Sequence, residues 1–561
     1  MKEESKSFKR IHLNGRFFKF ISLYLIIFLI FMFSLNSNGY CATYYVDFTN
    51  SERKSADSNN GTSSSTALIH CPGDNRYTPS GPAPTTLSAG DTVIFKGGIN
   101  YKGSINLNWS GSAGRVITYD GNSAGTWGRG KAVINNENDV SLTYGFATSA
   151  ARSYITIKNF TFQDIGGYTD AELAGFTNTD CPLAARGGKG ISIDDAGSNH
   201  ITIQNSNFGE IGNWQNHAGM SVNSMGGAGV WLANVSNVTI DSSDFNGMKI
   251  GIGVKAKDGN TIQNVEIKNN SFHDYVVWGI DVSPNSSKGD TLQNILIHNN
   301  TFYNLNKYAS GNWLGCGNPH SDGIFLRTAG LQNSTWTDVK IYGNTFYDNA
   351  GGTAEIYVSQ GPSAIIYNNE FYGTGNVSRL NVAYGIPTGT SPYPQVIRIL
   401  NNSFLGSSRF IMVKDMIADE DISVYIENNI FKDTRIGIYS PAYVNIAIPN
   451  GGTIESLDYN QYYADKSGRN VVHINGYKTF SGIVALGYEG NGQFCDPEYE
   501  STTNLFIKAT SPCKRKGKDQ SAYFTTDKNG ITRFPGAWGI GAYYYEISPP
   551  PSNLHLRSGG K

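Results

Sequence analysis

The stretch Val265–Phe272, VEIKNNSF, contains the pattern that decides the fold. Apolar residues occupy every second position, a small polar pair follows them, and a phenylalanine closes the pattern. Alternation with a period of two indicates a short strand with one buried face. The asparagines predict a bend, because asparagine tolerates left-handed backbone and bonds its own main chain. We therefore expect a strand, a turn and a phenylalanine that points back into the core.

The pattern occurs nine times, and the nine copies extend over residues 155–431. The copies are ITIKNFTF (Ile155–Phe162), ITIQNSNF (Ile201–Phe208), VTIDSSDF (Val238–Phe245), VEIKNNSF (Val265–Phe272), ILIHNNTF (Ile295–Phe302), VKIYGNTF (Val339–Phe346), AIIYNNEF (Ala364–Phe371), IRILNNSF (Ile397–Phe404) and VYIENNIF (Val424–Phe431). Units of this length that cannot bury a face alone indicate a solenoid. Short strands without helical periodicity between them favour a parallel β-helix. The uneven spacing of the copies predicts loops of different length on one surface, which in solenoids is commonly the binding face.

The composition limits the class of partner. The chain has 561 residues, a formal net charge of −1, 16% charged residues and 12% aromatic residues. The repeat indicates one domain over most of this length. A net charge near zero gives no electrostatic reason to expect nucleic acid. Low charge with many aromatic and hydroxyl side chains is typical of a secreted protein that binds neutral or weakly charged polymers.

The N-terminal segment predicts export. Six basic residues lie within residues 1–19, and Phe20–Leu35 is almost wholly apolar. That stretch is short for a spanning helix and has the length of a signal-peptide core. We predict residues 1–42 as a signal peptide, cleaved after Gly39 or Ala42. An uncleaved anchor and, through Cys41, a lipoprotein are the alternatives. The mature chain is then a monomer that is secreted or at the cell surface, or periplasmic, without membrane contact.

Five cysteines follow Cys41 in the sequence. They are Cys71, Cys181, Cys316, Cys495 and Cys513. An exported chain permits disulfides, and we expect Cys495 to pair with Cys513. The odd count leaves at least one free thiol, and the sequence holds no CxxC metal pattern.

Segments near both ends of the chain resemble a known superfamily. TYYVD (Thr43–Asp47), LSAGDTVIFKGG (Leu87–Gly98) and VITYDGN (Val116–Asn122) resemble the amino-terminal cap and first coils of right-handed parallel β-helix proteins, the pectate-lyase-like extracellular superfamily. DPEY (Asp496–Tyr499), SPC (Ser511–Cys513) and WGIGAYYYE (Trp538–Glu546) resemble their closing segment.

The resemblance implies an all-β chain in which residues 43–546 form a single right-handed parallel β-helix with a cap at each end. Residues 547–561 would then be a proline-rich tail. The superfamily includes lyases, hydrolases, epimerases and non-catalytic binders, and no pectate-lyase or polygalacturonase signature is present in this sequence.

A second class of strand lies between the copies of the first pattern. Its members are GISID (Gly190–Asp194), GVWLA (Gly229–Ala233), GIGVK (Gly251–Lys255), GIDVS (Gly279–Ser283), GIFLR (Gly323–Arg327) and EIYVS (Glu355–Ser359). Positions two and four are apolar and face the core, so positions three and five face solvent. Stacking in register would build two outward columns, one from Ser192 to Tyr357 and one from Asp194 to Ser359.

This outward face predicts a polysaccharide groove. Its expected substrate-binding residues are Trp231, Trp278, Phe325, Tyr357 and Lys189, and the long loops Gly166–Lys189, Glu210–Ala228 and Asn304–Asp322 would wall it. Sugars stack on aromatic rings, while charged groups contact carboxylates and hydroxyls. The alternative is that these polar and aromatic side chains serve only cross-strand packing.

The segment Asn318–Arg327, NPHSDGIFLR, has the highest density of chemically useful residues. His320 is suited to proton transfer, and Asp322 could orient its imidazole ring. Lys255 and Arg327 occupy one outward column, two coils and about 10 Å apart, with Asp281 between them on the neighbouring column. A structural histidine and a simple salt-bridge ladder are the alternatives.

These residues favour chemistry on an acidic glycan. A base, an acid and a cation that neutralises a uronate carboxylate are what β-elimination or C5 epimerisation requires, because the α-proton becomes removable only when the developing enolate is stabilised. A glycoside hydrolase would need two carboxyls about 5–10 Å apart, for which Asp281 and Asp322 are the candidates. A non-catalytic carbohydrate-binding or scaffold protein is the third hypothesis.

The adjacent acids Asp194 and Asp195 are a candidate calcium site, since calcium takes several oxygen ligands. Adjacent residues of a strand point to opposite faces, so only a bulge would let both bind one ion. The sequence predicts no other cofactor.

Overall fold

The computed structural model describes residues 41–50, 57–173, 187–212, 227–275, 277–286, 288–304, 321–328, 334–348, 353–359, 362–373, 378–384, 395–406, 409–415, 422–433, 446–448, 453–464, 468–474, 476–536 and 538–545. The predicted signal-peptide core, the C-terminal tail, His320 and most of the three long loops lie outside these residues, and the corresponding expectations stay predictions. No helix in the described part is long and apolar enough to cross a membrane.

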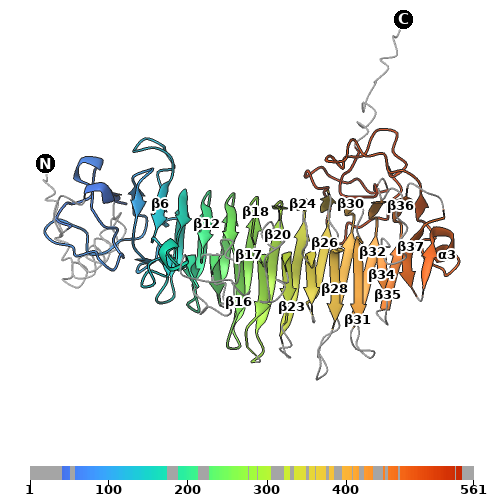
Figure 1. Cartoon of the computed structure of the whole chain (residues 1–561), viewed down its shortest axis with the longest axis horizontal. Coiled ribbons are helices and arrows are strands. Elements are labelled where there is room, and N and C mark those ends of the chain that lie inside the picture. Colours follow the sequence, from blue (N-terminus) through green and yellow to red (C-terminus); the bar gives the residue numbers. More distant parts are fainter. Residues whose placement is uncertain are drawn as a thin grey trace, which may run out of the picture. The chain divides into compact units, whose positions relative to one another are not determined.

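The described residues from Thr43 onward form three long sheets, each with 13 strands (Figure 1). The first sheet contains, in spatial order, β1 (Thr43–Val46), β2 (Thr92–Phe95), β5 (Ile117–Asp120), β8 (Ser153–Lys158), β11 (Asn199–Gln204), β14 (Ser236–Asp241), β17 (Thr261–Lys268), β20 (Thr291–His298), β23 (Thr335–Tyr342), β26 (Ala364–Tyr367), β29 (Gln395–Leu400), β32 (Ile422–Glu427) and β35 (Thr453–Asp458).

The second sheet contains β4 (Ile105–Asn106), β7 (Tyr144–Ala147), β10 (Lys189–Ile193), β13 (Ala228–Ala233), β16 (Ile250–Ala256), β19 (Trp278–Pro284), β22 (Asp322–Arg327), β25 (Ala354–Ser359), β28 (Ser378–Tyr384), β31 (Ile411–Asp415), β34 (Ile446–Ile448), β37 (Asn470–Ile474) and β38 (Tyr477–Thr479).

The third sheet contains β3 (Asn100–Tyr101), β6 (Ala132–Asn135), β9 (Phe160–Gln163), β12 (Asn207–Ile211), β15 (Asp244–Met248), β18 (Ser271–His273), β21 (Thr301–Tyr303), β24 (Thr345–Tyr347), β27 (Glu370–Tyr372), β30 (Ser403–Gly406), β33 (Ile430–Asp433), β36 (Gln461–Ala464) and β39 (Gln493–Phe494). The helical elements are short: η1 (Phe48–Asn50), η2 (Ser64–Thr66), α2 (Asp170–Leu173) and α3 (Phe480–Val484).

One coil takes one strand from each sheet. The chain runs from β16 in the second sheet to β17 in the first and β18 in the third, and then returns to the second sheet as β19, which pairs with β16 in parallel. The strand pairs in the described residues are parallel apart from β37 with β38, which is antiparallel. The chain is a right-handed parallel β-helix, which confirms the predicted fold class.

The repeated pattern turns the corner between the first and third sheets. VEIKNNSF was expected to be one strand followed by a turn, but it forms the end of β17 and the start of β18, joined at Asn269. Asn269 has the predicted left-handed backbone, with φ 55°, and Asn299 and Asn401 repeat it. Ile267 and Phe272 are fully buried, as predicted.

Two ladders run through the core along the repeat. The phenylalanines of the third sheet stack face to face, with ring centroids 4.9 Å apart for Phe245 and Phe272 and 4.8 Å for Phe272 and Phe302. At the second polar position, Asn270 donates from its backbone and side-chain nitrogens to Oδ1 of Asn300, at 2.9 and 3.0 Å. Such bonds satisfy buried amides that would otherwise be costly.

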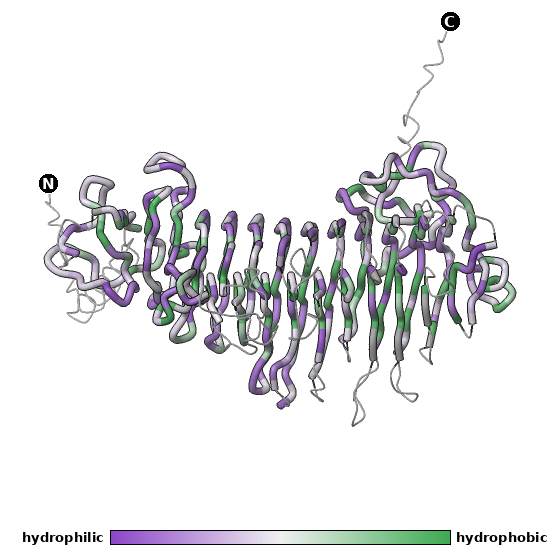
Figure 2. The backbone as a smooth tube through the Cα atoms, viewed as in Figure 1, coloured by the Kyte–Doolittle hydropathy of each residue, from purple (hydrophilic) through white to green (hydrophobic). Residues whose placement is uncertain are grey.

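The asparagine ladder ends on a carboxylate. It continues from Asn300 through Asn344, Asn369, Asn402 and Asn429 to Asn460. Asn460 then donates from Nδ2 to Oε1 of Glu489 at 2.7 Å, and the hydroxyl of Tyr462 donates to the same oxygen at 2.7 Å. Hydrophobic and hydrophilic residues are interspersed along the coils, as Figure 2 shows, in keeping with strands that bury one face.

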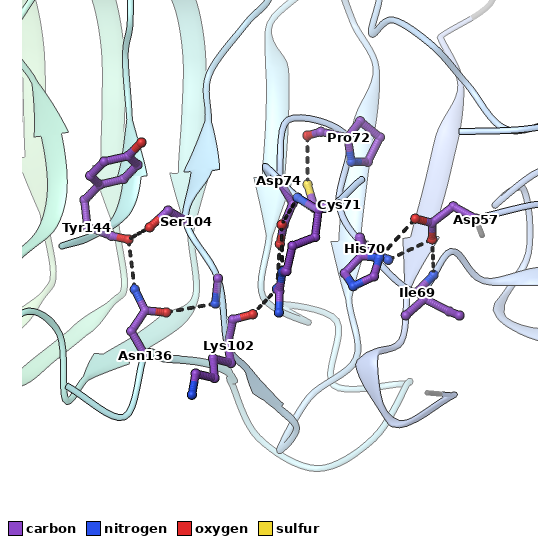
Figure 3. A network of polar contacts seen from close by, with 12 residues as sticks. Asp57, Ile69, His70, Cys71, Pro72, Asp74, Lys102, Ser104, Asn136 and Tyr144 are labelled. Carbon is purple, nitrogen blue, oxygen red and sulfur yellow. Dashed lines mark hydrogen bonds and ion pairs between the residues drawn. The ribbon is translucent and has the colours of Figure 1, made fainter. Parts of the chain in front are cut away.

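Buried polar contacts hold the N-terminal coils together (Figure 3). Asp57 accepts from the backbone N–H groups of Ile69 and His70 at 2.8 and 2.9 Å. Further along, Asn136 accepts from the backbone of Gly103 at 2.9 Å and donates to the carbonyl of Tyr144 at 3.0 Å. These bonds occupy backbone groups at an end of the solenoid, where unpaired edges would otherwise be exposed.

The C-terminal segment packs against the turns of the late coils, next to β30 in Figure 1. Asn401 donates to the carbonyl of Gly539 at 2.9 Å, and the hydroxyl of Tyr543 donates to Glu370 at 2.7 Å. The prediction of a Cys495–Cys513 disulfide was wrong, since both are free thiols. Cys513 is buried in an apolar cluster, and Cys495 accepts instead from the side chain of Gln461 at 3.1 Å.

Candidate functional site

The second sheet stacks in the predicted register. Ser192 pairs with Trp231, Trp231 with Gly253, Gly253 with Asp281, Asp281 with Phe325, and Phe325 with Tyr357. In the other outward column, Lys255 pairs with Ser283 and Arg327 with Ser359. Glycine at the first position of these strands leaves room for the stacked phenylalanine rings to pack against the backbone. A Cβ on Gly279 would lie only 3.0 Å from the ring of Phe302.

Four side chains of adjacent coils meet on this face, and we call them the Lys255 cluster: Lys255, Asp281, Ser283 and Arg327. The ammonium of Lys255 contacts Oδ2 of Asp281 and donates to Oγ of Ser283 at 2.6 Å. Arg327 reaches the same carboxylate from the other side, with Nη2 3.3 Å from Oδ2 and Nε 3.4 Å from Oδ1. The predicted convergence of Lys255 and Arg327 around Asp281 is therefore present.

The cluster is buried, which differs from the solvent exposure that the strand pattern predicts. Asp281 is 0% exposed and Lys255 is 4% exposed, whereas the Arg327 side chain is 29% exposed. These side chains do point away from the core, but they lie across neighbouring coils and cover one another. Period-two alternation sets the direction of a side chain and leaves its lateral packing open.

Burial also sets the protonation of the cluster. Burial lowers the pKa of Lys255 to about 8, although the carboxylate of Asp281 opposes this change, and the charge of Arg327 adds to it. Burial acts in the opposite sense on Asp281, but the charges of Lys255 and Arg327 outweigh it and hold the pKa of that carboxyl below its usual value. The site therefore pairs a permanent carboxylate with an amine that can lose its proton near neutral pH.

Aromatic rings frame the cluster. The ammonium of Lys255 lies 5.6 Å from the ring centre of Trp231, and that of Lys189 lies 5.1 Å from it. The guanidinium of Arg327 lies 4.8 Å from the ring of Trp278 and 5.3 Å from Phe325. Phe325 in turn stacks on Tyr357 at 5.1 Å. The five predicted substrate-binding residues thus surround the four residues of the cluster, and cation–π contacts hold the cations in place.

Asp322 lies apart from the cluster along the strand. It is paired in register with Trp278, three residues before Phe325, which is level with Asp281. Three residues of strand correspond to about 10 Å. Asp322 is fully buried and its Oδ1 accepts from the backbone of Ala354 at 3.0 Å, which ties it to the next coil. Its predicted partner His320 lies outside the described residues.

The sequence analysis missed Lys249. It is half-buried immediately before β16, outside the glycine-led strand pattern. Burial lowers its pKa, against the attraction of Asp281 and with the repulsion of Arg327. It lies two residues before Gly251, so the glycine-led strand pattern does not include it, and a lysine directly before β16 was the available signal. Lys249 is thus a further lysine whose charge interacts with the carboxylate of Asp281.

The predicted calcium ligands make other contacts. Asp194 forms ion pairs with Lys257 at 2.7 Å and with Lys189 at 4.0 Å. Within the described residues no group of three or more histidine, cysteine, aspartate or glutamate side chains could hold a metal ion. Asp194 is therefore an ion-pair partner of Lys257 and Lys189. No second ligand for an ion at Asp195 comes from the described residues.

A family model described as "Right handed beta helix region" matches residues 145–377. The match covers the central coils and agrees with the right-handed parallel β-helix fold that the three parallel sheets define. No curated protein matches the sequence.

Several solved structures are similar to this one at low identity. A GH136 lacto-N-biosidase from Eubacterium ramulus is 12% identical with a TM-score of 0.48, over 77% of this chain and 68% of that one. The A-module of a mannuronan C-5 epimerase from Azotobacter vinelandii is 12% identical with a TM-score of 0.41, over 72% and 90%. PfbA, a surface adhesin of Streptococcus pneumoniae, is 16% identical with a TM-score of 0.35, over 62% and 86%. They are likenesses of fold, and the chemistry must be argued from the site.

Proposed function

We propose that this protein is an exported enzyme that removes the C5 proton of a uronate unit in an acidic polysaccharide, as a lyase or an epimerase. The observation that carries the proposal is the Lys255 cluster. A lysine whose pKa is lowered to about 8 lies against a carboxylate and within two coils of an arginine that is still partly exposed. The same proposal includes secretion after removal of residues 1–42, action as a monomer and binding of a polysaccharide.

Lys255 would act as the general base. As a neutral amine it can donate to Asp281 and Ser283 and still direct its lone pair at the C5 proton of the substrate. Asp281 keeps the amine in position and takes up no proton itself, because its pKa is held low. Ser283 accepts the second N–H of the amine and thereby fixes its orientation.

Arg327 would neutralise the uronate carboxylate. It is the most exposed cation of the cluster, and its contacts of 3.3 and 3.4 Å with Asp281 are long for charge-assisted bonds. Its guanidinium therefore has donors to offer a second carboxylate. That contact would stabilise the charge that spreads onto the carboxylate when C5 loses its proton.

After removal of the C5 proton, the reaction can proceed to either of two products. In elimination, the electron pair left at C5 forms the C4–C5 double bond, the C4–O bond breaks, and the departing oxygen takes up a proton. In epimerisation, a proton returns to C5 from the opposite face. His320, which was predicted for proton transfer and lies outside the described residues, stays the candidate donor in both.

Glycoside hydrolysis has weaker support from this geometry. The general acid of a hydrolase needs a raised pKa, and the pKa of Asp281 is lowered. Asp322 starts its strand about 10 Å away and already bonds the backbone of Ala354. A non-catalytic carbohydrate-binding protein is the remaining alternative and an outcome of the test below.

The test incubates the purified mature protein with polygalacturonate, alginate and neutral glycans. New ultraviolet absorbance from an unsaturated product indicates a lyase, and incorporation of solvent deuterium at C5 without that absorbance indicates an epimerase. New reducing ends alone would indicate a hydrolase, and binding without any of these changes would indicate a binder. Either result would overturn the proposal.

An arginine variant sharpens this test. Arg327→Ala should weaken both binding and turnover on uronate polymers, because a carboxylate-neutralising group acts on the ground state and the transition state alike. Arg398→Ala is the matched control, since Arg398 lies on the first sheet against Tyr425 and Tyr523. Equal effects of the two variants would count against the proposed role of Arg327.

A further inference from the structure

The first sheet carries a hollow on its outer face, which we call the first-sheet groove. Its volume is about 490 Å³. It runs across β8, β11, β14, β17 and β20, and its lining includes His200, Thr202, Thr239, Asn264, Glu266 and Leu296. Several of the lining residues lie on β17, whose neighbour β16 carries Lys255 on the second sheet, so one coil supplies both sites from different faces.

A regular backbone feature creates the hollow. Six successive strands hold a residue in left-handed conformation at the same register, with φ between 51° and 56°: Tyr154, His200, Asn237, Asn264, Asn294 and Asp338. This residue reverses the alternation, so that in β17 Ile262 and Val265 are buried while Gln263 and Asn264 both face outward. A strand that slips by one residue in this way bends locally. Six aligned bends make the outer face of the sheet concave.

The floor and one wall of the groove are made of uncharged hydrogen-bonding groups. Thr156, Thr202 and Thr239 follow one another on paired strands. On the wall, Asn264 donates to Oδ1 of Asn237 at 2.9 Å and Asn294 donates to Oδ1 of Asn264 at 2.8 Å. Each such amide keeps further donor or acceptor capacity. The groups repeat at the strand spacing of about 4.8 Å, which suits a ligand that is itself a repeating polymer.

An aromatic pair closes one end of the groove. The rings of Tyr154 and His200 stack 4.4 Å apart with an interplanar angle of 14°, and His200 is exposed. At the other end, Glu266 is compensated by Lys268 at 2.8 Å and by His298 at 3.1 Å. The lining therefore offers ring surface, hydroxyls and amides, with a carboxylate that is already paired.

We propose that the first-sheet groove binds a neutral polysaccharide chain, independently of the Lys255 cluster. A neutral glycan presents hydroxyls to the threonines and asparagines and an apolar ring face to His200 and to the partly exposed Val116 and Leu296. An acidic glycan fits less well, because the lining contains no lysine or arginine that could pair with its carboxylates. The protein would thus hold a neutral polymer on one sheet and treat uronate units on another.

Binding measurements with defined probes test this inference. Wild-type protein is titrated calorimetrically with xylan, a mixed-linkage glucan, a mannan, polygalacturonate and alginate. We expect at least one of the neutral polymers to bind. The double variant Thr202→Val/Thr239→Val, which keeps side-chain shape and removes two hydroxyls, should weaken that binding by about tenfold. His200→Asn, which keeps a residue tolerant of left-handed backbone, should weaken it further in the same direction.

Two controls separate this inference from the proposed catalytic function. Thr291→Val alters a hydroxyl of the first sheet outside the groove lining and should leave neutral-glycan binding unchanged. Lys255→Met should also leave it unchanged, even if that variant abolishes every activity on uronates. Absence of binding to all three neutral polymers, or equal binding by wild type and the double valine variant, would overturn the inference. A double variant that weakens only the acidic polymers would overturn it too.

Discussion

The outer faces of the first and second sheets are built by the same coils but present opposite environments. On the second sheet, Lys255, Asp281 and Arg327 form a charged cluster in which the carboxylate is 0% exposed. On the first sheet, Thr202, Thr239 and Asn264 line an open groove whose carboxylate, Glu266, is paired. The inward residues of both sheets are mostly buried apolar side chains, so the outward residues decide the chemistry of each face.

The difference between the two faces is one of dielectric environment. Charges that lie in a buried cluster interact strongly and shift the pKa values of their neighbours, as Lys255 does. Hydroxyls and amides in an open groove make modest contacts that sum along a polymer. We therefore expect large effects on turnover from single changes on the second sheet, and gradual effects on affinity from changes on the first.

The largest expected effect is on turnover. Lys255→Met should lower the rate on uronate polymers by about 10²–10⁴, the usual size of a general acid–base contribution. Lys288→Met is the control, because Lys288 is largely exposed and pairs with the equally exposed Asp258. Steady-state kinetics on both variants, with circular dichroism to verify folding, make the measurement. Comparable losses in the two variants would remove the distinction between cluster and surface lysines.

A core substitution should affect both faces together. Ile267 is fully buried in the same core cluster as Val254 and Ile280 of the second sheet, and Ile267→Ala should reduce the free energy of unfolding by about 2–5 kcal/mol. Gln293→Ala, at an exposed outward position of β20, should change it by less than about 0.5 kcal/mol. Denaturant titration compares them. Unfolding of Ile267→Ala at the wild-type midpoint would contradict the shared core.

The pH dependence of stability should follow Glu489, at the end of the asparagine ladder. Burial raises its pKa from 4.5 to about 7, against the hydrogen bonds from Asn460 and Tyr462. The folded state then holds this proton more tightly than the unfolded state, so its contribution to stability is complete below pH 4.5 and is lost as the pH rises to 7.

Glu489→Gln should remove that dependence, which amounts to about 3 kcal/mol at most. The difference in unfolding free energy between wild type and variant, measured at pH 4 and pH 8, isolates it. Since the ladder lies at the corner between the first and third sheets and belongs to neither face, uronate turnover and neutral-glycan binding at pH 6 should both persist in the variant. A constant difference across the pH range would show that Glu489 does not titrate there.

The smallest expected effect concerns the aromatic frame. Trp231 is half-buried beneath the ammonium groups of Lys255 and Lys189. Trp231→Ala should raise KM several-fold and change kcat little, because the ring contacts substrate equally in the ground and transition states. Substrate titration on uronate polymers gives both constants. A decrease in kcat without a change in KM would instead show that Trp231 acts by positioning Lys255.

Much of this architecture follows from the sequence. Period-two alternation and the asparagine turns predict the buried Ile267 and Phe272 and the left-handed Asn269, and register alone brings Lys255 and Arg327 to one column. The burial of Asp281 could not be predicted, because it depends on how long side chains of adjacent coils lie across one another. The absence of the Cys495–Cys513 disulfide could not be predicted either, because the sequence does not show that Cys513 packs into an apolar cluster.

The first-sheet groove did leave a signal in the sequence. Ile262 and Val265 are three residues apart, and the same interval separates Leu292 from Ile295 and Trp336 from Val339, in front of the period-two pattern. A repeated interval of three within a strand marks a slip in alternation. Which ligand chemistry fills the resulting hollow depends on residues from five strands, and these come together only in the folded chain.

The most direct measurement of the central claim is deuterium exchange at C5 of a uronate polymer as a function of pH, with wild type and Lys255→Met compared by nuclear magnetic resonance. Exchange or elimination at C5 should require neutral Lys255, so the wild-type rate at low substrate should rise about tenfold per pH unit and level off near pH 8, where the pKa of Lys255 lies. Lys255→Met should slow the reaction by about 10²–10⁴ near pH 8 and should lose this rise with pH. An equal rate in the two proteins, or a wild-type rate that falls between pH 6 and pH 8, would contradict the assignment of Lys255 as the base.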